Sequence, residues 1–149
     1  MKESMKKIEE MTRLSIFEVF KKMFFVFLEP LDDEGNGYDV EAAIRFEGPV
    51  SGEIRIFLST DLVKTMVQNM LGLQEDEITM QSMEDCSKEA VNMICGNFLG
   101  RFDSTKVFNL SVPTFSKEIR SLELGKNAFR TDFDSDGGRV GMMATLSNQ

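Results

Sequence analysis

Two carboxylates and one carboxamide share a helical spacing in the middle of the sequence. Asp85 is followed four residues later by Glu89 and three further by Asn92. On a helix that turns roughly 100° per residue, these side chains project within about 60° of one another, and Gly96 continues the same line. Carboxylates can pair with a cation, and an amide can donate and accept hydrogen bonds at once. The spacing alone is equally typical of ordinary solvated polar residues.

Other chemistries are excluded by residues that the chain lacks. It contains no histidine, which removes Ser-His-Asp and Cys-His nucleophile systems and most zinc sites. Its two cysteines, Cys86 and Cys95, lie roughly 13 Å apart along one predicted helix, which is too far for a disulfide. We expect reduced, packed thiols and no cofactor or metal site of the protein's own.

We call the line formed by Asp85, Glu89, Asn92 and Gly96 the polar stripe. The helix that carries it is predicted from Ser82 to Phe102. Opposite the stripe, an apolar sector that would pack on a sheet contains Cys86, Ala90, Met93 and Ile94. Asn97 falls inside this sector, and we therefore expect it to be a buried amide that satisfies backbone groups.

The elements around this helix are predicted from their hydrophobic periods. Apolar spacing indicates a helix over 3–28, ended by Pro30, and a shorter helix that begins at one of residues 59–61 and ends at Gly72. Alternation predicts a hairpin over 40–58 with one solvated face, a strand over 107–112 and a second hairpin over 129–146. The chain is predicted to be α+β, a single domain over 1–149 in which antiparallel hairpins form a sheet with long helices on one face.

Charge and hydropathy narrow the possible partners. With 25 acidic against 17 basic residues, the net charge is -8, which disfavours nucleic acid as a partner and favours a protein. The longest apolar run, over 23–28, is far shorter than the roughly 20 residues that span a bilayer. The first residues also do not have the pattern of a secretion signal, so we expect a cytoplasmic protein without membrane contact.

The segment 132–137 matches the first half of a calcium-binding EF-hand loop. The position at which such a loop needs a bidentate glutamate is Met143, and the flanking residues alternate as strands do. A hairpin turn is the preferred interpretation.

The segment 85–97 resembles the signature of the CheC/FliY/CheX chemotaxis phosphatases, and the order of the predicted elements is similar to CheX over most of the chain. The resemblance implies catalytic roles for two residues. Glu89 would pair with a lysine of a phosphorylated CheY-like receiver domain, and Asn92 would hold the attacking water in line with phosphorus. Asp85 and Gly96 would contact the partner. The Mg²⁺ would be supplied by the receiver.

The resemblance also implies a homodimer, because CheX relatives pair through their sheets. Relatives of the CheC type carry a second signature on the first helix, but residues 1–35 here contain no asparagine, so we expect a single site. One alternative remains open. The chain could be a non-catalytic, CheX-like dimeric adaptor or scaffold in a two-component signalling complex, on which the stripe only docks a partner.

Overall fold

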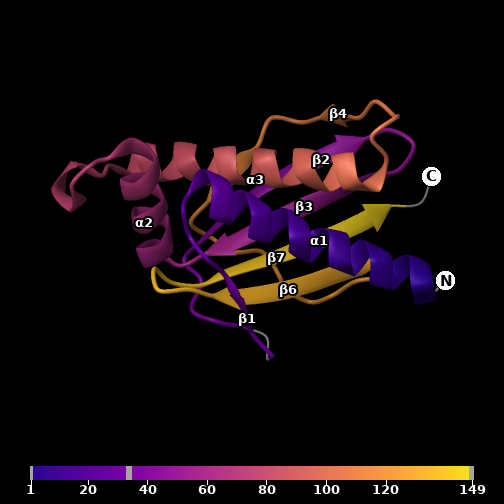
Figure 1. The fold of residues 1–149 in the computed structure, drawn as a ribbon, viewed down its shortest axis with the longest axis horizontal. Coiled ribbons are helices and arrows are strands. Elements are labelled where there is room, and N and C mark those ends of the chain that lie inside the picture. The colour runs from indigo at the N-terminus through magenta and orange to yellow at the C-terminus, as the bar shows by residue number, and fades with distance from the viewer. Residues whose placement is uncertain (1, 33–34, 148–149) are drawn as a thin grey trace.

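The computed structural model describes residues 2–32 and 35–147 and, in residues 2–5, the backbone alone. Three α-helices and a short 3-10 helix accompany a seven-stranded sheet (Figure 1). The helices are α1 (Lys2–Met23), α2 (Thr60–Leu71), η1 (Glu75–Glu77) and α3 (Met80–Phe102). The strands are β1 (Glu29–Pro30), β2 (Val40–Glu47), β3 (Ser51–Leu58), β4 (Asn109–Leu110), β5 (Thr114–Ser116), β6 (Ala128–Asp134) and β7 (Val140–Ser147).

The sheet is antiparallel at every pairing, in the order β1-β6-β7-β3-β2-β4, and β5 also pairs with β2. Its centre consists of the two predicted hairpins joined side by side, with Ile54 of β3 opposite Ile44 of β2 and Ala144 of β7. Figure 1 shows α1 and α3 lying next to each other across one face. The prediction of an α+β fold with helices on one face of antiparallel hairpins is therefore confirmed.

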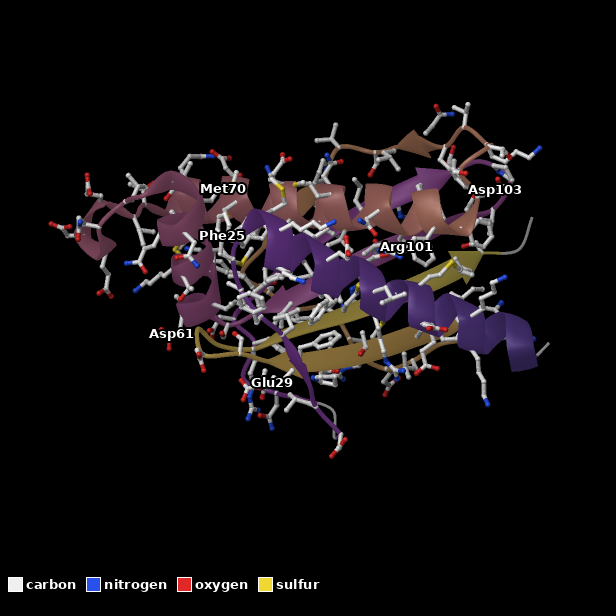
Figure 2. All side chains as sticks on the ribbon, in the orientation of Figure 1. Phe25, Glu29, Asp61, Met70, Arg101 and Asp103 are labelled. Carbon is white, nitrogen blue, oxygen red and sulfur yellow. The ribbon has the colours of Figure 1, made fainter. Side chains whose placement is uncertain are left out.

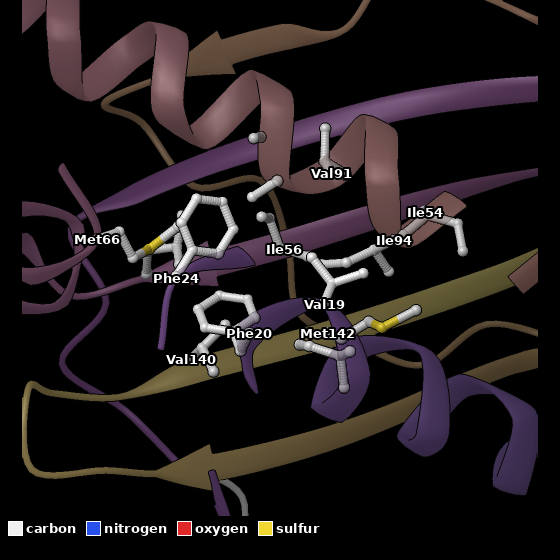
Figure 3. Packing of buried hydrophobic residues seen from close by; sticks show 14 of the residues in the cluster. Val19, Phe20, Phe24, Ile54, Ile56, Met66, Val91, Ile94, Val140 and Met142 are labelled. Carbon is white, nitrogen blue, oxygen red and sulfur yellow. The ribbon is translucent and has the colours of Figure 1, made fainter. Parts of the chain in front are cut away.

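The hydrophobic core fills the space between this face and the helices. Figure 3 shows side chains from α1, α2 and α3 meeting those of β3 and β7. Fully buried members of this cluster include Phe20, Phe24, Ile54, Ile56, Met66, Val91, Ile94, Val140 and Met142. The stripe-bearing helix is thus fixed from three sides, by the sheet, α1 and α2.

Helix α1 ends earlier than the hydrophobic pattern predicts, at Met23 instead of Leu28. Phe25 adopts a positive φ of 56°, which ends the helix and turns the chain toward β1. Beyond it, Val26 and Leu28 are buried and Phe27 is exposed, as in an extended segment. The prediction was wrong because an apolar run fits a buried helix and a partly buried extended chain equally well.

Helix α2 has the predicted caps. The Ser59 hydroxyl accepts a hydrogen bond from the Leu62 amide, and Gly72 adopts the left-handed conformation that ends the helix. The same hydroxyl accepts a second bond from the Arg139 amide. The β6–β7 turn is therefore tied to the start of α2, and a Cβ at Gly138 would lie 2.4 Å from the Ser59 hydroxyl.

The second face of the sheet is less solvated than the alternating pattern predicts. Glu41 and Arg55 are only 4% and 7% exposed, and their side chains pair at 2.7 Å. Arg120 donates to Glu41 at 2.9 Å, and Arg55 also donates to the main-chain carbonyl of Ser121 at 3.0 Å. The prediction that one face of this hairpin is solvated was wrong, because the segment between β5 and β6 covers this part of the sheet.

The predicted strand over 107–112 is reduced to Asn109–Leu110. It forms the edge of the sheet together with β5, and Val107 and Val112 on either side of it are 84% and 83% exposed. A short strand with exposed flanks pairs only briefly with β2. In the described parts of the chain, no helix combines the length and the apolar character that a membrane span requires.

Candidate functional site

Helix α3 starts with a capping box that fixes its first turn. The Thr79 hydroxyl accepts a hydrogen bond from the Ser82 amide at 3.0 Å, and the Ser82 hydroxyl accepts one from the Thr79 amide at the same distance. The buried face of the helix then continues to Phe98, whose ring lies 6.2 Å from that of Phe46 on β2. Packing of this face determines which side chains the helix presents to solvent.

The four predicted site residues lie on the outer face of α3. Asp85, Glu89 and Gly96 are exposed, and Asn92 is half-buried. Asp85 accepts a hydrogen bond from the side-chain amide of Gln81 at 2.8 Å, which orients the Asp85 carboxylate. Among the side chains that the structure describes, in residues 6–32 and 35–147, none makes a hydrogen bond or ion pair with Glu89 or Asn92. Both therefore keep their polar groups available to a partner.

Glu89 also affects the buried thiol beneath it. Burial, and secondly the negative charge of Glu89, raise the pKa of Cys86 to about 12. Burial alone raises the pKa of Cys95 to about 12, and both cysteines are free and buried, as predicted. At neutral pH both are protonated, so neither provides the thiolate that nucleophilic attack requires.

Gly96 leaves a gap in the polar stripe one turn beyond Asn92. A Cβ built there would have no atom of another part of the chain within 4 Å. Close helix packing within this chain therefore does not explain the glycine. A hollow of about 280 Å³ lies beside it, between α3 and α1, lined by Glu18, Val19, Lys22, Met23, Met93, Gly96 and Asn97.

Asn97 is not the buried amide that its position on the helix predicts. It is half-exposed, and its side-chain oxygen accepts a hydrogen bond from Arg101 at 2.8 Å. Arg101 also approaches Glu18 of α1 at 3.8 Å, and Glu18 pairs with Lys22 at 2.9 Å. The prediction was wrong because α1 leaves a hollow beside this part of α3, so the amide reaches solvent and joins an ionic contact between the helices.

In α1, Glu18 is the residue that comes nearest to a second phosphatase signature. Its carboxylate already pairs with Lys22. The hydrogen bond and charge of Lys22 are the main reasons that the pKa of Glu18 lies below its ordinary value. Three residues further on, where an amide would be needed, the chain has Lys21.

Two exposed apolar side chains near the stripe escaped the sequence analysis. Met70 and Leu71, in the last turn of α2, line a hollow of about 330 Å³ together with Ser82, Asp85, Cys86 and Glu89 of α3. The only local signal was a leucine directly before Gly72 at the helix end. Their position beside the stripe depends on how α2 packs against α3.

Asp132, the first acid of the EF-hand-like segment, is occupied by protein groups. It is 4% exposed and accepts hydrogen bonds from Tyr38, Arg130 and the Gly35 amide. Among the described residues, no group of three or more Cys, Asp or Glu side chains is arranged to hold a metal ion. The turn packs against α2 instead.

Comparison with protein families gives a match to the family described as chemotaxis phosphatase CheX, over residues 40–132. The chain belongs to the CheX family. The matched range covers more than half of the sequence and includes all of α3 with Asp85, Glu89, Asn92 and Gly96. Comparison with curated protein sequences finds no match.

Solved structures of CheX and related proteins have the same fold. The chemotaxis protein CheX from Vibrio vulnificus is 21% identical, with a TM-score of 0.78 over 94% of this chain and 96% of that one. CheX in a CheX-CheY-BeF3-Mg²⁺ complex from Borrelia burgdorferi is 19% identical, with a TM-score of 0.73 over 93% and 97% of the two chains. FliY from Thermotoga maritima is 13% identical, with a TM-score of 0.65 over 99% and 91%.

Proposed function

We propose that this protein hydrolyses the aspartyl phosphate of a CheY-like response regulator, with Glu89 and Asn92 as its catalytic residues. The observation that carries the proposal is that Glu89 is exposed and Asn92 partly so, one turn apart on the outer face of α3, with no side-chain partner for either among the described residues. Membership of the CheX family supports the class of reaction, and the solved CheX-CheY complex supports the class of partner.

In the proposed mechanism, Glu89 binds a lysine of the receiver and so orients α3 over the phosphorylated aspartate. Asn92 then reaches the phosphoryl group, where its amide holds a water molecule by donating one hydrogen bond and accepting another. An amide is too weak a base to remove the proton of the water, so its contribution is to position the water in line with phosphorus. Asp85 and Gly96 would contact the receiver on either side.

The Mg²⁺ that neutralises the developing charge on the phosphoryl group would arrive with the receiver. This chain would supply only the positioning groups, so the complete site would form in the complex. For the same reason, we expect negligible hydrolysis of small aryl phosphates by the protein alone.

The decisive experiment measures phosphate release from phosphorylated receivers of the same source. Asn92→Ala should lower kcat by about 100-fold or more, because a misplaced nucleophile can cost that much. Glu89→Ala should also remove most of the activity, and the double variant should not exceed spontaneous hydrolysis because we expect a single site.

The same helix offers matched controls. Asn97→Ala removes an amide that is occupied by Arg101, and Glu84→Ala removes a carboxylate that pairs with Lys88 at 3.0 Å. Both controls should keep nearly normal activity. If wild type binds the receiver and releases no phosphate, the chain is an adaptor and the catalytic proposal is wrong.

A further inference from the structure

An exposed apolar rim borders the N-terminal half of α3. It consists of Phe25, Met70 and Leu71, which are 66%, 39% and 54% exposed. Phe25 comes from the turn after α1, and the other two come from the end of α2. The Asn69 side chain donates a hydrogen bond to the carbonyl of Phe24 at 2.9 Å, which joins the two segments. Figure 2 shows Phe25 and Met70 at the same end of the molecule.

The backbone of Phe25 is in a conformation that a bulky residue rarely adopts. Its φ of 56° lies in the left-handed region, where a Cβ is disfavoured. Amides on either side, those of Phe24 and Val26, both donate to the Phe20 carbonyl and hold the turn in place. Its neighbours Phe24 and Val26 are buried, but the Phe25 ring points away from the core. An exposed aromatic ring held by a strained backbone is typical of a binding contact.

The α2 part of the rim and the polar stripe meet in one hollow. The cavity of about 330 Å³ has Met70 and Leu71 on one side and Asp85 and Glu89 on the other. Its size is at the low end of the roughly 300–1,000 Å³ of ligand pockets, so it suits a protruding side chain better than a cofactor. Whatever occupies the hollow therefore also contacts Glu89, the carboxylate that would bind a lysine of the receiver in the proposed function.

The surroundings of the hollow determine the charge of its occupant. Asp85 and Glu89 line it, and the preceding segment adds the exposed Glu75, Asp76 and Glu77. The nearby Lys64 is 4.0 Å from Glu75, so its charge is partly balanced. An occupant that complements this surface combines an apolar side chain with an adjacent lysine or arginine.

We propose that the rim is a docking surface for the receiver, and that the hollow takes up an apolar side chain of the receiver next to a basic one. This inference rests on the proposed function and adds a binding determinant to it. The rim would govern how tightly the receiver binds, and Glu89 and Asn92 would govern the chemical step. Rim contacts exist before and during the reaction alike, so their loss raises KM and leaves kcat unchanged.

Two variants test the rim. Leu71→Ser should raise KM for the phosphorylated receiver about tenfold, with kcat within about twofold of wild type. Phe25→Gly should raise KM similarly and also raise the thermal midpoint, because glycine relieves the backbone strain. A purely structural role for this ring would lower the midpoint instead. Weaker binding of the beryllofluoride-activated receiver, measured at equilibrium, should accompany both changes in KM.

Leu124→Ser is the matched control. The exposed fraction of Leu124, 49%, is similar to that of Leu71. Leu124 belongs, however, to the segment that covers the other face of the sheet. It should leave KM unchanged. An unchanged KM in both rim variants, or an equal rise of KM in Leu124→Ser, would contradict the proposal that the rim docks the receiver. The Asn92→Ala variant would still test the catalytic site independently. If wild type binds the beryllofluoride-activated receiver but releases no phosphate, the catalytic proposal is wrong and the binding measurements alone decide the rim. If wild type binds no receiver, the rim is wrong.

Discussion

At the scale of single residues, Gly96 has no structural role within the chain. It is exposed inside a long helix, and a side chain there would meet nothing within 4 Å. Gly96→Ala should therefore raise the free energy of unfolding by about 1 kcal/mol, because alanine is the better helix former. If the receiver approaches the helix backbone here, the same variant should raise KM. Denaturant titration and phosphate-release kinetics measure the two effects.

Gly100 provides the comparison, since it is also exposed on α3 with nothing within 4 Å of a built Cβ. It lies about 12 Å along the helix from Asn92, twice as far as Gly96. Gly100→Ala should stabilise the fold without changing KM. A stabilised Gly96→Ala with unaltered kinetics would remove Gly96 from the proposed receiver contact.

At the scale of elements, the segment between β5 and β6 is held on the sheet by charged groups. Glu41 is nearly buried and pairs with Arg55 at 2.7 Å and with Arg120 at 2.9 Å. Arg55→Ala should lower the free energy of unfolding by about 3–5 kcal/mol, because it leaves a buried carboxylate without its closest partner. Arg120→Ala should cost about 1 kcal/mol or less, since Arg120 is half-exposed.

Arg45→Ala is the control on the neighbouring strand. Its side chain is 75% exposed and lies 3.8 Å from Glu53, so the change should be within about 0.5 kcal/mol. Chemical denaturation at pH 7 compares the three variants. Similar stabilities for Arg55→Ala and Arg45→Ala would show that the buried pair does not hold this segment.

At the scale of the whole molecule, we expect a homodimer to form at the sheet edge made by β4 and β5. These two short strands pair with β2 on one side, no strand of the described chain pairs with their other side, and the neighbouring Val107 and Val112 are largely exposed. Open strand edges and exposed apolar groups favour pairing with another chain. Light scattering should give twice the 16.9 kDa of one chain.

Val112→Glu should shift the dimer toward monomer by placing a charge at the edge. Leu124→Glu, on the segment that covers the sheet, should leave the mass unchanged. A wild-type protein that has the mass of one chain at working concentration contradicts the dimer. A dimer that persists in Val112→Glu would place the interface elsewhere.

The sequence alone determined those features that depend on neighbours along the chain. Strand alternation predicted both hairpins, Ser59 and Gly72 predicted the ends of α2, and helical spacing placed Glu89 and Asn92 on one face. These signals are local because a strand repeats every two residues and a helix about every 3.6. The roles of the site residues remain proposals, but the shared exposed face did not require the tertiary structure.

Only the tertiary structure decided features that join distant segments. Helix α1 ends shortly before Phe25, next to the point where Asn69, far along the chain, donates a hydrogen bond to the Phe24 carbonyl. Arg120 binds Glu41 on a sheet face that the alternation of the strands predicts to be solvated. Asn97 falls inside the apolar sector by helical spacing, and the position of α1 leaves it open to solvent. The hollow beside Glu89 likewise forms from two helices. Packing between residues far apart in sequence sets each of these, and no local period encodes it.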